Sequence, residues 1–461
     1  MNPWPFQKEV VQRTKKALHS GFKAPCIVMP TGSGKTVVAS TIIHSIMKQL
    51  GTDTGGRFLF LVHREELVHQ TIATLKEIEC EEHAGIIQSG VAGSPWAPIQ
   101  VAMVQTLTKR LHKVDWLRPR VIFVDEAHHA TAGTWRKIIQ KWPKAFVIGM
   151  TATPARTDDK GLGFIFDKLI IGPGIQDLTP EYLAPVKLLA VDIDFISQAS
   201  SLKMQSEHGR SGPVLAKVVE TWLRHAKDKK TIFFGSDVEH SKAINEELLS
   251  HGIKSVHLDG DTNKQERRSK LEAVKRGDYQ CVCNCRLFTE GTDWKEAECV
   301  VLATKTQSLT LYKQMIGRAM RRGVDKQAVV IDCGGNWYFL GLPDEDIEWS
   351  LEKGVLKDQV KSAASKVVQC ESCGFVYSKT EDSCPLCAHV NTKPMPLEVD
   401  ANVKEIKSEH QKPTKKKISS EIIATGGDIE KLKEIQKKYG YGHGWAWKMH
   451  KVYKFAWSKE R

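Results

Sequence analysis

The chain has 461 residues, of which 41% are hydrophobic, enough to build two or three globular domains. No apolar run approaches the roughly 18 residues that a membrane-spanning helix needs, and the start MNPWPFQKEV lacks the regions of a signal peptide. We therefore expect an intracellular protein with no membrane partner, in which seven scattered cysteines stay reduced.

The net charge of +13 is unevenly distributed along the chain. Residues 401–461 hold 15 lysines and arginines but only 7 acidic residues. A surplus of this kind favours a polyanionic partner, of which nucleic acid is the commonest. The alternative is a basic tail that only improves solubility.

Short apolar runs rich in valine, isoleucine and phenylalanine alternate with segments of helical periodicity. In chain order the first series is APCIVMP, RFLFLV, IQVAM, RVIFVDE and AFVIGMT, and the second is KTIFFGS, SVHLDG, YQCVCN, CVVLAT and QAVVIDC. This alternation predicts an α/β fold with two parallel sheets in tandem. The polar stretch near 190–210 marks their junction, so we expect domains at 1–190 and 191–345.

The first apolar run leads into MPTGSGKT, Met29 to Thr36, and a helix-like segment follows. A strand, a glycine-rich loop and a helix together form a phosphate cradle, although Met29 stands where the strict Walker pattern has glycine. Lys35 is expected to reach the β- and γ-phosphates of a nucleotide and Thr36 to ligate Mg²⁺. The loop residues expected around the phosphates are Pro30, Thr31, Gly32, Ser33 and Gly34.

A pair of carboxylates ends the apolar run VIFVDEAHH. Carboxyl ends of parallel strands meet at one edge of a sheet, so Asp125 and Glu126 should lie beside the phosphate loop. We predict that Asp125 holds Mg²⁺. In an extended chain Glu126 would point to the opposite side, toward the γ-phosphate, where it would act as the general base.

Four cysteines in the C-terminal part have the spacing of a metal site: Cys370, Cys373, Cys384 and Cys387. Two C-x2-C pairs separated by ten residues suit tetrahedral Zn²⁺, with two turns that each present two sulfurs and a short hairpin between them. We expect a structural zinc ribbon within 346–395. CVCNC at 281–285 is instead interpreted as an alternating strand with buried thiols.

The remaining segment, 396–461, comprises a basic linker and an aromatic-rich helical end, YGYGHGWAWKMHKVYKFAW. Its aromatic rings can stack on unpaired bases while lysines contact phosphates. Aromatic residues at helical spacing can equally pack onto a neighbouring domain.

PTGSGKT together with DEAH at 125–128 resembles the signature of the superfamily 2 DEAD/DEAH-box helicases, and other segments resemble further motifs in the family's order. These are LVHREELVHQ (61–70), VAMVQTL (101–107), MTATPAR (150–156), LFTEGTDW (287–294) and QMIGRAMR (314–321). In this family the phosphate loop often begins without glycine, which accounts for Met29. The ribbon, the terminal helix and DCGGNWYFLGLPDEDIEWSLE are similar to RadD-like helicases of phages and prophages.

The resemblance implies two RecA-like domains, ATP hydrolysis and roles for residues in each motif. Adenine recognition is implied for Gln7, further cofactor contacts for Gly291 and Asp293, and coupling for His128, Thr151 and Thr153. Nucleic-acid contacts are implied for Arg64, Gln105, Thr106, Arg156, Ser236, Gly260 and Thr289. Thr292 and Trp294 depart from the apolar residues that usually flank Asp293.

The QMIGRAMR segment (314–321) has a physical reason to enter the same site. Cleavage of a γ-phosphate builds negative charge on its oxygens, and arginines from a second domain neutralise that charge when the cleft closes. Arg318 and Arg321 are three residues apart, so we predict that they share one face of a helix. Gln314, one turn earlier, would orient the water or contact the γ-phosphate.

Together these features predict an ATP-, Mg²⁺- and Zn²⁺-dependent DNA helicase or translocase in a bacterial or phage-infected cell. Single-stranded or branched DNA is the expected partner, and replication or recombination proteins are possible ones. An RNA helicase and a branched-DNA remodeller or annealer remain alternatives. A third alternative is a nucleic-acid clamp that ATP switches without unwinding.

Overall fold

The computed structural model describes residues 2–50, 57–91, 93–154, 161–191, 213–285, 287–289, 294, 296–323, 326–345, 347–352, 359–360, 362, 365–391 and 428–439. The chain divides into two compact units, Met1–Met395 and Pro396–Arg461. The second unit contains helix α15 (Ile429–Tyr439), and the aromatic-rich run that follows it lies outside the described residues. Among the described helices, none is long and apolar enough to cross a membrane.

The first unit begins with a parallel sheet of seven strands in the order β3-β4-β2-β5-β6-β1-β7. The strands are β1 (Pro25–Val28), β2 (Arg57–Val62), β3 (Ala84–Ile87), β4 (Ile99–Met103), β5 (Pro119–Asp125), β6 (Phe146–Thr151) and β7 (Lys168–Ile171). Central strands such as β1 and β5 are buried along nearly their whole length, which explains why they appear in the sequence as continuous apolar runs.

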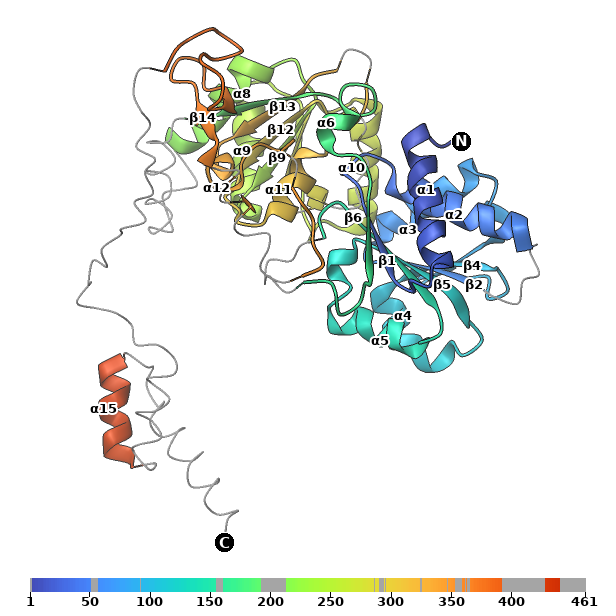
Figure 1. Cartoon of the computed structure of the whole chain (residues 1–461). Coiled ribbons are helices and arrows are strands. Elements are labelled where there is room, and N and C mark those ends of the chain that lie inside the picture. The colour runs from blue at the N-terminus through green and yellow to red at the C-terminus, as the bar shows by residue number, and fades with distance from the viewer. Residues whose placement is uncertain are drawn as a thin grey trace. The chain divides into compact units, whose positions relative to one another are not determined.

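Helices cover both faces of this sheet (Figure 1). One face packs against α1 (Pro5–His19), α2 (Lys35–Leu50) and α3 (Glu65–Glu77), and the other against α4 (Val104–Arg110) and α5 (Gly133–Lys141). Alternate residues of β2 serve the two cores: Phe60 faces the first and Leu61 the second. Short 3₁₀ turns are η1 (Glu81–His83), η2 (Leu111–Lys113) and η3 (Ala127–His129).

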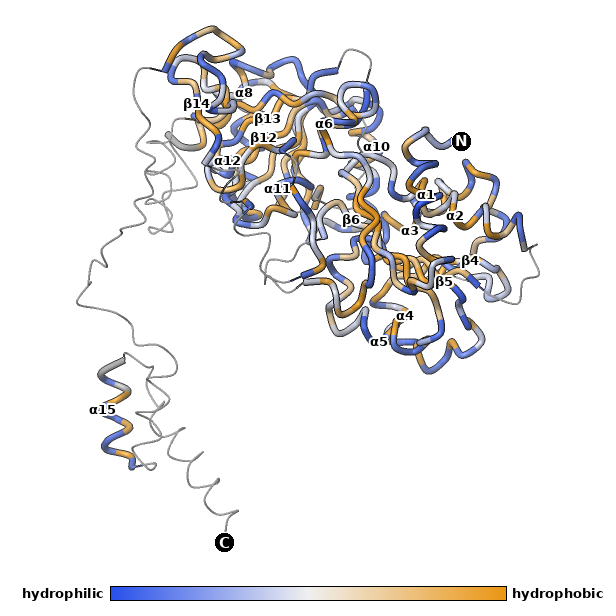
Figure 2. Tube along the Cα trace, in the orientation of Figure 1, coloured by the Kyte–Doolittle hydropathy of each residue, from blue (hydrophilic) through white to orange (hydrophobic). Residues whose placement is uncertain are grey.

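A second parallel sheet of six strands has the order β10-β11-β9-β12-β13-β8. Its strands are β8 (Val186–Ala190), β9 (Thr231–Gly235), β10 (Ser255–Leu258), β11 (Cys281–Asn284), β12 (Cys299–Ala303) and β13 (Ala328–Asp332). Its helical elements are α6 (Ile175–Leu178), which precedes the sheet, α8 (Pro213–Ala226), α9 (Val238–Ser250), α10 (Lys264–Arg276), η4 (Leu287–Thr289), α11 (Leu309–Ile316) and α12 (Asn336–Leu340). Figure 2 shows hydrophobic colour concentrated along the strands of both sheets.

Two sequence expectations change in detail. The predicted boundary at 190 assigns β8 to the first domain, but β8 pairs with β13 and therefore belongs to the second sheet. The first four residues of the CVCNC segment form β11, and all four are buried between two helical layers, so burial does not alternate along the strand. Burial raises the pKa of Cys283 far above its usual value, so this thiol stays protonated.

The four-cysteine segment carries the antiparallel pair β14 (Val367–Gln369) and β15 (Val376–Ser378). This hairpin encloses the first cysteine pair and does not lie between the two pairs as predicted. The segment also contacts the edge strand β8: Phe375 forms a β-bridge with Leu189, and the amide of Ala190 donates to Gly374 O at 2.9 Å. The cysteine segment is thus joined to the second sheet through backbone hydrogen bonds.

Candidate nucleotide site and its connections

The phosphate loop (residues 29–36) follows the buried strand β1 and leads directly into helix α2, whose first residue is Lys35. Gly32 and Gly34 have φ angles of +88° and +84°, which only glycine adopts without strain. The ammonium of Lys35 donates to Met29 O and Pro30 O, both at 3.3 Å, so the loop curls around this side chain. Amide groups at a helix N-terminus and a lysine together form an anion site.

Gln7, which the family resemblance singled out, contacts this loop directly. Its amide nitrogen donates to Ser33 O at 2.8 Å, and its amide oxygen accepts from the backbone of Trp4 at 2.9 Å. A Cβ built on Gly34 would lie 2.4 Å from Gln7 Nε2. The absence of a side chain at Gly34 therefore leaves room for the Gln7 amide at the phosphate loop.

The two predicted carboxylates lie at the end of β5, next to Lys35. Burial, followed by the nearby Glu126, raises the pKa of Asp125 to about 7, whereas Lys35 lowers it. Glu126 is not extended as predicted: its φ of +49° turns the chain into η3, and its Oε2 lies 3.4 Å from His128 Nδ1. A buried carboxylate whose charge is this costly suits a site that receives a cation.

Mg²⁺ fits the residues that surround the phosphate loop. Within the described part of the chain, Glu126 Oε2 is buried and accepts no hydrogen bond. Asp125 and the Thr36 hydroxyl supply the hard oxygen ligands that Mg²⁺ prefers. These two residues would hold the ion, which supplies charge neutralisation for phosphate oxygens when it is bound.

A chain of hydrogen-bonding side chains leads from this site to the second sheet. His128 Nδ1 lies 3.1 Å from Thr151 Oγ1, and this hydroxyl donates to Thr153 O at 2.9 Å. The hydroxyl of Thr153 donates to Thr310 Oγ1, at 2.8 Å, in α11. The structure therefore connects the three predicted coupling residues and adds Thr310, which carries no signal in the sequence.

The QMIGRAMR segment lies against the phosphate loop, although its arginines do not share a helix face. Helix α11 ends at Ile316, and Arg321 forms a β-bridge with Leu183. The backbone turns at Gly317, where an added Cβ would lie 2.5 Å from Thr31 Cβ. Gln314 and Arg318 are buried, and the charge of Arg318 lowers the pKa of Lys35, after burial as the main cause.

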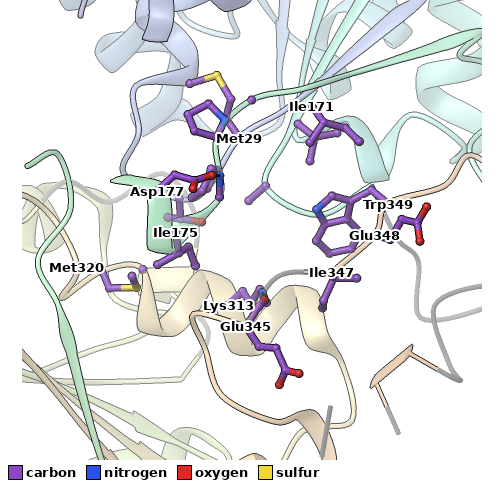
Figure 3. Close-up of a pocket in the computed structure, with 18 residues that line it drawn as sticks. Met29, Ile171, Ile175, Asp177, Lys313, Met320, Glu345, Ile347, Glu348 and Trp349 are labelled. Carbon is purple, nitrogen blue, oxygen red and sulfur yellow. Dashed lines mark hydrogen bonds between the residues drawn. The ribbon is translucent and has the colours of Figure 1, made fainter. Parts of the chain in front are cut away.

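A cavity of about 340 Å³ adjoins the phosphate loop on the side of Met29 (Figure 3). Its walls come from Met29 to Thr31, from the β7–α6 connection, from α11 and the turn after it, and from Glu345 and residues 347–349. Lys35, Asp125 and Glu126 are not among its lining residues. The cavity therefore lies where three parts of the first unit meet: the half built on the first sheet, the half built on the second sheet, and the segment after α12.

The predicted nucleic-acid residues that the structure describes follow the C-terminal ends of strands, in loops or at the start of short helices. Arg64 Nη1 donates to Leu287 O at 2.9 Å, and Gln105 Nε2 donates to His63 O at 3.0 Å. Thr106 is buried in α4, Ser236 follows β9, Gly260 follows β10 and Thr289 ends η4. Arg156, Gly291, Thr292 and Asp293 lie outside the described residues. Arg64 thus contacts the second half of the unit in this structure.

The four cysteine sulfurs of the C-terminal segment lie within 4.8 Å of one another. The two turns that carry them are built alike: Gly374 N donates to Cys370 O at 3.0 Å, and Ala388 N donates to Cys384 O at 2.8 Å. Gly374 and Ala388 both have positive φ, at +72° and +59°. Four sulfurs at this separation fit a tetrahedral zinc ion, which would have no open position for water.

Comparison with known proteins identifies two matching families. Residues 1–156 match the family described as "Type III restriction enzyme, res subunit", and residues 214–323 match "Helicase conserved C-terminal domain". A 51.5 kDa protein of a Lactococcus phage is 32% identical over 89% of this chain and 87% of its own length. The putative ATP-dependent helicase IRC3 of Saccharomyces cerevisiae is 30% identical over 68% of this chain, which spans only 49% of that protein.

More distant matches are consistent with these. A DNA 3′-5′ translocase, XPB2, of Sulfurisphaera tokodaii is 25% identical over 71% of this chain and 80% of its own length. A fragment of a putative HsdR subunit of a type I restriction enzyme from Vibrio vulnificus shares the fold, with a TM-score of 0.58 and 24% identity. The match covers 74% of this chain and 66% of that structure.

Proposed function

Because the chain belongs to the superfamily 2 DEAD/DEAH-type helicases of the phage type, we propose that it is an ATP-dependent DNA helicase or translocase. The observation that carries the proposal is the connection from His128 through Thr151 and Thr153 to Thr310. Through these hydrogen bonds, the end of β5 that carries the two carboxylates is connected to α11, the helix that carries Gln314. Opening and closing of the cleft would then follow the state of the nucleotide.

In the first half of the proposed site, Lys35 binds the β- and γ-phosphates of ATP, and Thr36 and Asp125 hold Mg²⁺. Glu126 accepts a proton from the attacking water and so orients it toward the γ-phosphate. Asp125 ends β5 and Glu126 follows it, whereas Lys35 and Thr36 begin α2 after the loop that follows β1. The four side chains are thus presented from one edge of the first sheet.

The second half of the proposed site is the 314–321 segment, which supplies positive charge. Arg318 and Arg321 neutralise the charge that develops on the phosphate oxygens, and Gln314 contacts the γ-phosphate or the water. Arginine fingers of this kind are worth on the order of 10³ to 10⁵ in rate. The proximity of the Gly317 turn to Thr31 supports this assignment, because it brings the arginine segment against the phosphate loop.

DNA is the proposed substrate because the first domain matches a restriction-enzyme family and one relative is named a DNA translocase. The basic residues of 401–461 support a polyanionic substrate. The phage relative supports a setting in the cytoplasm of an infected bacterium, in replication, recombination or repair. We also propose that the four cysteines hold one structural zinc ion, which would stabilise the two cysteine turns next to β8.

The test is steady-state ATP hydrolysis by the wild type and by Lys35→Ala and Glu126→Gln, with single-stranded, duplex and forked DNA and with RNA. Stimulation by DNA that both variants lose would support the proposal. Stronger stimulation by RNA would favour an RNA helicase. Tight DNA binding with negligible turnover in the wild type would contradict the proposal and favour a nucleic-acid clamp.

A further inference from the structure

The outer side of α4 and α5 carries a positively charged surface whose cations all lie outside the family motifs. We call the exposed sides of α4, η2, α5 and the turn to β6 the α4–α5 surface. Six exposed cations lie on it: Lys109, Arg110, Lys113, Arg136, Lys137 and Lys144. Within the described part of the chain, none of the six forms an ion pair.

This surface has almost no compensating negative charge. Residues 107–124 and 127–146 contain a single carboxylate, that of Asp115, and it is already paired with Lys141 Nζ at 2.6 Å. On the opposite face of the sheet, carboxylates accompany the cations: α1 carries Glu9, and α3 carries Glu65, Glu66 and Glu77. The α4–α5 surface is distinguished by the near absence of carboxylates among its cations.

The helices beneath the cations are packed against the sheet. Leu107 of α4, Leu117 of the loop before β5, and Trp135 and Ile138 of α5 are buried against the sheet. The opposite sides of the two helices are thereby fixed toward solvent. A surface of this kind holds its charges at nearly constant spacing, as binding of a stiff polyanion requires.

The surface starts at a predicted nucleic-acid contact. Gln105 lies in the first turn of α4, and Lys109 follows four residues later on the same exposed side. Helix α4 is seven residues long, about 10 Å, so its cations begin within one turn or two of Gln105. Nucleic acid leaving the predicted track near Gln105 would thus reach the α4–α5 surface.

We propose that the α4–α5 surface binds the phosphate backbone of duplex DNA next to the strand held in the motor cleft; this inference rests on the proposed function. Duplex DNA carries one charge per about 1.7 Å of its axis, so dispersed lysines and arginines gain more from it than from a single strand. Contacts of this kind position the duplex and do not discriminate between sequences.

The experiment compares a triple variant, Lys109→Gln, Lys113→Gln and Lys137→Gln, with a control of equal charge change. The control is Lys8→Gln, Lys16→Gln and Lys48→Gln, which are exposed residues of α1 and α2 on the opposite face. The affinity for forked DNA and for single-stranded DNA of the same length is measured without ATP at several salt concentrations.

For forked DNA, the α4–α5 variant should bind at least about tenfold more weakly, and its slope of log affinity against log salt should be shallower by roughly two to three. Single-strand binding and the control should change far less. Equal losses in the two triple variants, or equal losses on single-stranded and forked DNA, would overturn the proposal. Wild-type ATP hydrolysis tests the motor function separately, because these binding measurements need no turnover.

Discussion

The hydrogen bond between Thr153 and Thr310 yields a quantitative prediction about communication between the two sheets. Its two hydroxyl oxygens are 2.8 Å apart, and Thr153 is fully buried. A neutral hydrogen bond contributes about 1 kcal/mol net, which corresponds to roughly a fivefold change in an equilibrium constant. Thr153→Val and Thr310→Val remove the bond with little change of shape.

If DNA contacts both halves as proposed, it would favour the arrangement in which this bond exists, so we expect each variant to need roughly fivefold more DNA for half-maximal stimulation of ATP hydrolysis. The assay measures hydrolysis against DNA concentration for the wild type, both single variants and the double variant. A double-mutant cycle should give a coupling free energy of about 1 kcal/mol. Strictly additive effects would refute this role for the pair.

Three further predictions concern the phosphate loop and the four-cysteine segment. Gly34→Ala should weaken ATP binding by at least about tenfold, because the new Cβ collides with Gln7, whereas Gly252→Ala, with a similar φ but open space, should leave it unchanged; equal effects would refute the collision. Ala388→Gly should stabilise the zinc-loaded protein by about 1 kcal/mol in thermal unfolding, since φ there is +59°; a lower melting temperature would contradict this. Chelation should release one zinc ion per chain and lower the melting temperature; release of none would remove the zinc assignment.

Most of the fold can be predicted because parallel strands buried on both faces appear as apolar runs. All ten apolar runs identified in the sequence form strands in the structure. Within the two parallel sheets, the described strands without a matching run are β3, β7 and β8, and each lies at the edge of its sheet. Edge strands are only partly covered, as the exposed ends of β7 show, so their sequences carry a weaker apolar signal.

The residues of the site were easier to predict than their backbone geometry. Lys35 and Asp125 lie where the motifs require, because the motif itself dictates a strand, a turn and a helix. Nothing in the sequence predicts that Glu126 adopts a left-handed conformation or that helix α11 ends before Arg318. Thr310 could not be found at all, since its importance comes from a contact with Thr153, 157 positions away in the sequence.

We propose that ATP hydrolysis drives movement of the protein on DNA. Displacement of a labelled strand from forked DNA tests this proposal most directly. The wild type with ATP and Mg²⁺ should displace the strand, whereas Glu126→Gln should bind the fork without displacing it. Displacement by Glu126→Gln at the wild-type rate would contradict the account, because strand separation would then not depend on hydrolysis at this site.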